Sequence, residues 1–218
     1  DETGLGDKVT KRNKRNKLKL ILRDCLRQKS VGVIEEIPEK GIVKYAKPVG
    51  VIASLVPTTN PCLTPAGQVI YAIKARDVII CSPHPRAKKT TNKCINIIRE
   101  TLVREGAPAD IIQGIEEPSI TLTQELMKRC DLVSATGGRP MVKSAYSSGR
   151  PSYGVGPGNP PVVLDRGYDL TDAVKMTITA VGSDNGILVG VLAIGAALHQ
   201  LVAGPLLSVT DRCVLGVG

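Results

Sequence analysis

Four short loops carry most of the residue types in this sequence that could hold an anion or a nucleotide. They are Pro57-Thr-Thr-Asn-Pro61, Ser82-Pro-His-Pro-Arg86, Thr136-Gly-Gly138 and Gly154-Val-Gly-Pro-Gly-Asn159. Hydroxyl groups, cationic side chains and glycines that let a backbone come close are the groups with which proteins bind phosphate. The loops therefore indicate a phosphate-bearing or otherwise anionic ligand.

The first loop ends an apolar run and begins a helical pattern. Pro57, Thr58 and Thr59 would place backbone N–H groups and two hydroxyls at the positive end of that helix. Asn60 adds an amide donor that stands just before Pro61. A plain turn with a helix cap explains the same residues, so this loop alone does not decide between the two interpretations.

The second loop combines a hydroxyl, two prolines and a basic stretch. Ser82, Pro85 and Arg86 could face a ribose or a phosphate, and Lys88 and Lys89 follow directly. Its histidine, His84, is one of only two in the chain, so no histidine metal cluster or serine triad can be assembled. We interpret His84 as a structural residue or a nucleotide contact, and not as a catalyst.

The glycine-rich loops allow close approach of a ligand without the usual dinucleotide fingerprint. Thr136, Gly137 and Gly138 follow a predicted strand, and Gly154 and Gly156 follow another. No GxGxxG lies between a strand and a helix. The six cysteines are never closer than thirteen residues apart, so no CxxC metal or redox motif exists and no metal site is expected.

Alternating element types must position these loops. The apolar runs 49–56, 78–82, 111–115 and 132–136 are each followed by a helical pattern, at 62–74, 87–105, 119–129 and 140–147. Successive strand–helix units require right-handed crossovers, which produce a parallel sheet. We predict an α/β fold with a Rossmann-like open parallel sheet and flanking helices, and ligands bind outside the carboxyl ends of such strands.

The segment before this region is basic and ends in a strand pair. Residues 1–29 hold ten Lys/Arg and four acidic residues, which accounts for +6 of the net charge of +9. Leu18, Ile21 and Cys25 recur at helical spacing, so we predict a basic helix over 8–29 with a solvated charged face. The alternative is a contact with phosphate or an anionic surface. Residues 31–37 and 41–46 alternate and predict a hairpin.

Composition argues against several other classes of protein. There are five Tyr, no Phe and no Trp, which disfavours base stacking on nucleic acid and interfacial anchoring in a membrane. The uncharged run 187–207 reaches the length of a membrane span, but glycines, His199, Gln200 and Pro205 interrupt it. We expect a cytoplasmic protein with reduced thiols that binds neither nucleic acid nor membrane. A nucleic-acid or membrane-surface protein anchored by 187–207 is the competing hypothesis.

The loops, in this order and spacing, resemble the CoA-acylating branch of the aldehyde dehydrogenase superfamily. The resemblance covers roughly residues 2–186, and the stretch from Arg23 to Pro48 is most similar to sulfoacetaldehyde dehydrogenases. Besides the four loops, it rests on Glu2-Thr-Gly-Leu-Gly-Asp7, Lys47-Pro-Val-Gly-Val-Ile52 and Met141-Val-Lys-Ser-Ala-Tyr-Ser-Ser-Gly149. Each motif alone is weak evidence for the family, but all of them together, in the same order and spacing, are specific for it.

The resemblance implies oxidation of an aldehyde by NAD or NADP, with coenzyme A as co-substrate. A cysteine thiolate attacks the aldehyde, hydride passes to the cofactor, and CoA takes the acyl group. By position, Asn60 would hold the oxyanion, and the loop residues would line the dinucleotide. These residues are Pro57, Thr58, Thr59, Ser82, His84, Pro85, Arg86, Thr136, Gly137, Gly138, Gly154 and Gly156. A homo-oligomer is implied for the intact enzyme.

The sequence departs from the family at the nucleophile. The cysteine should follow Ser183-Asp-Asn-Gly186 by a few residues, where Val189 stands, and in residues 187–218 we expect no part of the family's catalytic domain. We predict a basic helix and strand pair at 1–47, a nucleotide-binding domain at 48–186 and an unmatched apolar tail at 187–218. The alternative function is an inactive nucleotide-binding fragment or pseudoenzyme. We interpret Cys62 as a small core residue in preference to a substitute nucleophile.

Overall fold

The computed structural model describes residues 2–156, 161–162, 168–181 and 192–193. The chain divides into two compact units, with the boundary between Gly156 and Pro157. The first unit contains all four predicted loops up to Gly156. The domain boundaries predicted after residues 47 and 186 stay predictions.

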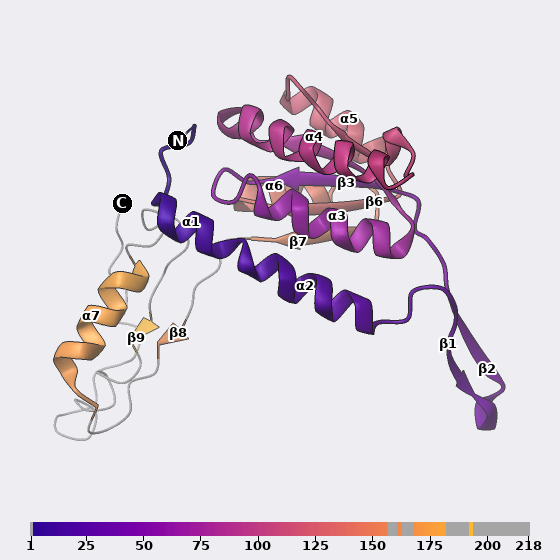
Figure 1. Ribbon diagram of the computed structural model, residues 1–218, viewed down its shortest axis with the longest axis horizontal. Coiled ribbons are helices and arrows are strands. Elements are labelled where there is room, and N and C mark those ends of the chain that lie inside the picture. Colours follow the sequence, from indigo (N-terminus) through magenta and orange to yellow (C-terminus); the bar gives the residue numbers. More distant parts are fainter. Residues whose placement is uncertain (1, 157–160, 163–167, 182–191, 194–218) are drawn as a thin grey trace. The chain divides into compact units, whose positions relative to one another are not determined.

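A five-stranded parallel sheet forms the centre of the first unit (Figure 1). Its strands are β3 (Val51–Val56), β4 (Val78–Pro83), β5 (Ile112–Gly114), β6 (Leu132–Thr136) and β7 (Ser152–Val155), in the order β5-β4-β3-β6-β7. The central strand β3 is buried from Ile52 to Val56, as expected of a parallel strand covered on both faces. The predicted α/β fold with a parallel sheet is confirmed.

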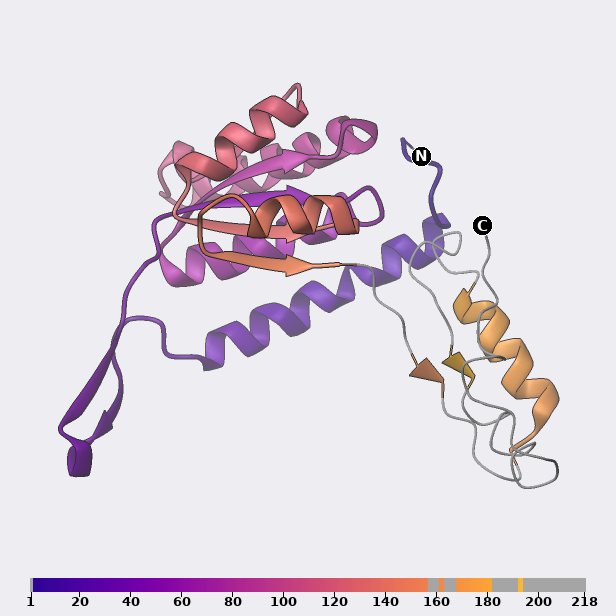
Figure 2. The ribbon, with the colours of Figure 1, turned by 180° about the vertical axis from the view of Figure 1, so that it is seen from behind.

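Helices cover both faces of the sheet (Figures 1 and 2). They are α3 (Leu63–Ala75), α4 (Lys88–Arg104), α5 (Ile120–Arg129) and α6 (Arg139–Tyr146), with short 3-10 turns at η2 (Pro85–Ala87) and η3 (Ala109–Ile111). One apolar cluster joins α3 and α4 to the sheet through Val69, Ile79 and Ile95. A second joins α5 and α6 to the other face through Met127 and Ala145. The chain therefore builds the sheet outward from β3 in one direction through β4 and β5, and then in the other direction through β6 and β7.

The basic segment forms two helices where the sequence predicts one. α1 (Lys8–Lys14) starts at Asp7, whose carboxylate accepts a hydrogen bond from the Thr10 N–H at 2.8 Å, and α2 (Asn16–Arg27) follows directly. α2 packs along α3, and a Cβ on Gly67 of α3 would make an ordinary contact of 3.5 Å with the Ile21 Cδ1 atom. Cys25 is buried, as the apolar stripe predicts.

The predicted hairpin is present as an antiparallel pair. β1 (Gly32–Ile37) and β2 (Ile42–Ala46) are joined by η1 (Pro38–Lys40) and Gly41, which has a φ of 61° that favours glycine. Within the described part of the chain, the pair belongs to no larger sheet. Nearly all of its residues are exposed on both faces.

The described part of the second unit is small. β8 (Pro161–Val162) pairs in parallel with β9 (Leu192–Ala193), and α7 (Leu170–Val181) starts where the Asp169 carboxylate accepts from the Asp172 N–H at 2.8 Å. Val189 and most of the run 187–207 lie outside the described residues. Of the helices that the structure describes, none combines the length and apolar character needed to cross a membrane.

Candidate functional site

The parallel sheet brings the predicted loops to one edge. All five strands run in the same direction, so the loops that follow β3, β4, β6 and β7 leave from their carboxyl ends (Figure 2). The His84 N–H donates to the Val56 carbonyl at 3.1 Å, and the Gly137 N–H donates to the Val155 carbonyl at 3.1 Å. The first bond joins the loop after β4 to the end of β3, and the second joins the loop after β6 to the end of β7. The reversal of strand order between β3 and β6 is the position where open α/β sheets bind their ligands.

The Asn60 loop is held by backbone contacts, while its amide is poorly satisfied. The Asn60 carbonyl accepts from the Thr64 N–H at 3.1 Å, which starts α3, and the Thr59 carbonyl accepts from the Lys11 ammonium. The Asn60 amide nitrogen has a long contact of 3.5 Å with the Thr59 hydroxyl, and its buried Oδ1 has no partner among the described residues. Buried polar groups without partners are rare, so this amide suits a ligand contact.

Ser82 ties the second loop to α5, and His84 stabilises the loop from within. The Ser82 hydroxyl is buried and shares a hydrogen bond of 2.8 Å with the Thr123 hydroxyl of α5. The His84 Nδ1 accepts from the Arg86 N–H at 3.1 Å, and desolvation together with the Arg86 charge lowers the pKa of His84. The imidazole is therefore neutral near pH 7, which fits a structural role better than that of a proton donor.

The cations behind this loop have acidic neighbours that the sequence did not predict. The Glu2 carboxylate accepts from the N–H groups of Lys89 at 3.1 Å and Thr90 at 2.7 Å, so it occupies the positive end of α4. Desolvation alone would raise the pKa of Glu2, but hydrogen bonds from Thr90 and Lys89 outweigh it and lower the pKa. Lys88 pairs with Glu117. Arg86 is exposed, and its guanidinium lies 3.5 Å from the Thr3 carbonyl.

The four predicted site glycines differ in what surrounds them. A Cβ on Gly154 would lie 2.6 Å from the Val142 Cγ1 atom and 2.7 Å from a ring carbon of Tyr146, so packing against α6 requires glycine there. A Cβ on Gly137 would lie at a tight 3.2 Å from the Met141 sulfur, whereas one on Gly138 would make an ordinary contact of 3.7 Å with Pro140. Among the described residues, nothing lies within 4 Å of a Cβ on Gly156. Gly156 is thus the glycine where a ligand meets least obstruction.

Cys62 does not lie in the core, and its interpretation as a small core residue is wrong. It is exposed at the residue that precedes α3, and its carbonyl accepts a hydrogen bond from the Cys94 thiol on α4 at 3.5 Å. The sequence predicted only that Cys94 belongs to the inner stripe of its helix. Their proximity arises from the packing of α3 beside α4.

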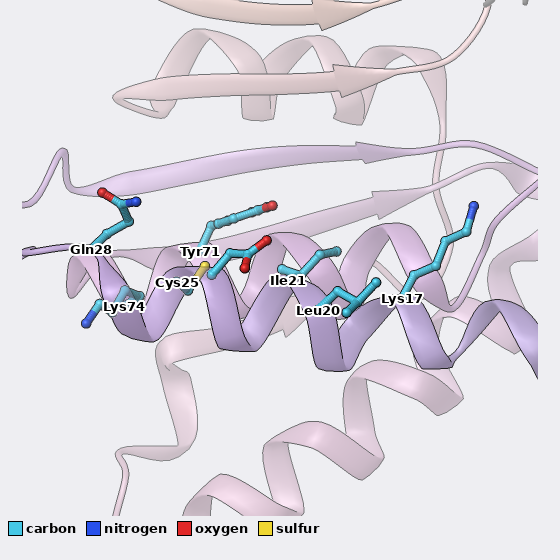
Figure 3. Close-up of a pocket in the computed structure, with 8 residues that line it drawn as sticks. Lys17, Leu20, Ile21, Cys25, Gln28, Tyr71 and Lys74 are labelled. Atoms are coloured by element: carbon cyan, nitrogen blue, oxygen red, sulfur yellow. The ribbon is translucent and has the colours of Figure 1, made fainter.

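A pocket of about 580 Å³ lies elsewhere, between α2 and the second half of α3 (Figure 3). The loops meet the first turn of α3, whereas the pocket is lined by Tyr71 and Lys74 farther along that helix. Its remaining lining residues come from α2 and are Lys17, Leu20, Ile21, Asp24, Cys25 and Gln28. This pocket is therefore separate from the loop edge.

A family model described as the aldehyde dehydrogenase family matches residues 16–186, and the chain belongs to this family. Its relatives identify the CoA-acylating branch, so the expected relationship is confirmed. A sulfoacetaldehyde dehydrogenase from Acholeplasma sp is 50% identical over 188 residues, which cover 85% of this chain and 38% of that protein.

Two solved structures show the same architecture. An acetylating aldehyde dehydrogenase from Geobacillus thermoglucosidasius has a TM-score of 0.79 and 37% identity, and the match covers 93% of this chain and 46% of that one. An engineered glycolyl-CoA reductase with bound NADP⁺ has a TM-score of 0.67 and 28% identity, with 93% and 47% covered. The chain therefore spans less than half the length of these relatives.

Proposed function

We propose that this chain forms the nicotinamide-dinucleotide-binding part of a CoA-acylating aldehyde dehydrogenase, which oxidises sulfoacetaldehyde or another short-chain aldehyde to an acyl-CoA. The observation that carries the proposal is the gathering of the four loops at one sheet edge beside the reversal of strand order. The relatives support the reaction class, since one is described as a sulfoacetaldehyde dehydrogenase and another as an acetylating enzyme.

The residues at this edge fit a dinucleotide. Gly156 leaves space for close approach, Arg86 offers an exposed cation, and the hydroxyls of Thr58 and Thr136 lie on the two loops beside the switch point. NAD or NADP, when bound, would accept the hydride removed from the substrate. The solved relative with bound NADP⁺ supports a nicotinamide cofactor. In this proposal His84 shapes the loop and donates no proton, because its imidazole is neutral.

Asn60 is the proposed oxyanion contact. The Asn60 amide nitrogen, the atom that would donate to an oxyanion, makes only a long contact of 3.5 Å with the Thr59 hydroxyl, and the start of α3 directly after it adds the positive end of a helix. A donor held in this way stabilises charge that develops on an aldehyde oxygen, because no reorganisation is needed when the charge appears. The acyl group would then pass to CoA, in line with a Gly154 loop that contains no glutamate.

The alternative function is dinucleotide binding without turnover. The feature that favours it is Val189, which stands where the resemblance places the nucleophilic cysteine, since valine cannot attack a carbonyl. The two functions differ in one observable. Mixing the chain with aldehyde, CoA and NAD or NADP produces reduced cofactor for the enzyme and none for the binding protein.

Titration of the chain with NADH and NADPH tests the shared claim of a dinucleotide site. The fluorescence of the reduced cofactor should rise and saturate, without interference from tryptophan, which the chain lacks. Arg86→Ala should weaken binding by roughly tenfold, because a charged hydrogen bond contributes about 1.5 kcal/mol. Arg104→Ala, at the opposite end of α4, is the matched control. If neither cofactor binds, the proposal is overturned.

We also propose that the chain assembles with copies of itself through the β1–β2 hairpin. Val43 and Tyr45 of β2 are 47% and 61% exposed, and Val33 lies opposite Tyr45 in the ladder. In the described part of the chain no second layer covers this exposed sheet, and a two-stranded sheet is marginally stable by itself. A second copy of the chain would supply that layer.

A further inference from the structure

We propose that Cys62 and Cys94 form a dithiol site that a hydroperoxide converts into an intramolecular disulfide next to the Asn60 loop. Cys62 is exposed at the N-cap of α3, and Cys94 is half-buried on α4. The Cys94 thiol donates a hydrogen bond to the Cys62 carbonyl oxygen at 3.5 Å, which places the Cys94 sulfur beside Cys62. Both helices pack on the same face of the sheet, which keeps the two side chains together.

The two thiols divide the chemistry between them. The hydrogen bond from Cys94 lowers the pKa of Cys62 to about 7, although desolvation acts in the opposite direction. The same bond, together with desolvation, raises the pKa of Cys94. Cys62 is therefore about half ionised near pH 7 and attacks first, because the thiolate is the nucleophile. Cys94 keeps its proton and acts as the resolving thiol.

The other cysteines in the described part of the chain do not compete for oxidant. Cys25, Cys81 and Cys130 are buried. Burial raises the pKa of Cys81 to about 11, which leaves almost no thiolate at neutral pH. Accessibility and thiolate character thus coincide at Cys62.

The oxidation balances in two steps. The Cys62 sulfur attacks one oxygen of hydrogen peroxide, the O–O bond breaks, and a sulfenic acid and one water form after proton transfer. The Cys94 thiol then attacks the sulfenic sulfur, a second water leaves with the Cys94 proton, and the S–S bond forms. The peroxide is reduced by two electrons and the two thiols are oxidised. A thiol reductant converts the disulfide back to the dithiol.

Oxidation at this place would act on the candidate site. The Cys62 carbonyl accepts from the Ala66 N–H at 3.1 Å, so Cys62 belongs to the first turn of α3, and Asn60 lies two residues before it. A bond to Cys94 would shift this turn and with it the Asn60 amide. This consequence rests on the proposed function, whereas formation of the disulfide does not.

Peptide mass mapping after peroxide treatment tests the disulfide directly. The full chain is treated with hydrogen peroxide, its remaining thiols are alkylated, and the protein is digested without reductant. We expect the peptides that contain Cys62 and Cys94 to be linked, with the loss of two hydrogens. Oxidation of Cys62 without this linkage would overturn the proposal. Titration of the oxidised chain with cofactor then distinguishes the two proposals. The titration reports on the dinucleotide site, whereas the linked peptides report on the disulfide.

Alkylation kinetics at pH 7 test the hydrogen bond between the thiols. Cys94→Ala removes the donor, so the pKa of Cys62 should return toward about 8.5. A smaller fraction of Cys62 is then ionised, but each thiolate is more reactive. The net effect should be alkylation slowed on the order of threefold. Cys94→Ser keeps a hydroxyl donor, so Cys62 should stay fast yet form no disulfide. Cys25→Ser is the control on a buried cysteine. An unchanged rate in Cys94→Ala would contradict the pairing.

Discussion

Glu2 shows how a single residue can set the charge of the candidate site. Its carboxylate occupies the first N–H groups of α4, the position that would otherwise attract a phosphate. Arg86, Lys88 and Lys89 make the same region basic in sequence, which by itself would suit the 2′-phosphate of NADP. In the proposed dinucleotide site, Glu2 would favour ribose hydroxyls over that phosphate, because a carboxylate accepts from hydroxyls and repels phosphate.

Glu2→Gln should therefore shift cofactor preference toward NADPH. Loss of one charge at a helix start corresponds to about 0.3–1 kcal/mol, so the ratio of NADPH to NADH affinity should rise about two- to fivefold. Because hydrogen bonds hold the pKa of Glu2 below its ordinary value, the wild-type carboxylate is charged at pH 7 and loses its effect only as pH falls through that lowered pKa. Parallel fluorescence titrations measure the ratio. Glu100→Gln, an exposed acid on the same helix, should leave it unchanged.

At the scale of elements, α6 and β7 depend on a close approach at Gly154. The Tyr146 hydroxyl accepts from the Gly154 N–H at 3.1 Å, and the ring of Tyr146 fills the place of a Cβ. This contact explains the glycine by packing alone. The role of Gly154 in cofactor binding stays a prediction, while Gly156 has no packing reason to be glycine.

Gly154→Ala should destabilise the fold by about 1–3 kcal/mol, the usual cost of overpacking a tight contact. Gly156→Ala should change stability by less than about 0.5 kcal/mol, because nothing lies within 4 Å of the added Cβ. Urea unfolding followed by far-ultraviolet circular dichroism compares the two variants. Equal stabilities would mean that α6 moves aside at little cost and that the packing account of Gly154 is wrong.

At the scale of the whole molecule, the hairpin is the part of the first unit with the least support from the rest of the chain. Its strands pair only with each other among the described residues, and its apolar residues are exposed on both faces. The sheet and its helices bury two separate apolar clusters that do not include it. Assembly would compensate for this lack of a covering layer.

Val43→Lys should reduce the oligomer, because a buried lysine in an apolar contact is strongly unfavourable. Val103→Lys places the same charge on an exposed valine of α4 and serves as the control. Size-exclusion chromatography with light scattering reports the mass of both variants at equal concentration. A monomeric wild-type chain, or an unchanged oligomer in Val43→Lys, would exclude the hairpin as the interface.

Local patterns in the sequence were enough to predict most elements of the first unit and their order. Alternating and helical periodicities placed β3, β4, β6 and the helices between them to within about two residues. The exception is the basic segment, where a break at Arg15 divides one predicted helix into α1 and α2. The charged residues on both sides of Arg15 carry no signal for this break, because the apolar stripe lies farther along.

The sequence by itself determined the α/β class, the four loops and, through motifs in register, the family, because each depends on residues close together along the chain. Only the tertiary structure decided which side chains meet. Glu2 reaches α4 across 87 residues, Cys62 meets Cys94 across 32, and Tyr146 occupies the space above Gly154. Such contacts depend on how helices pack on the sheet, and local propensity carries no information about side chains that packing brings together.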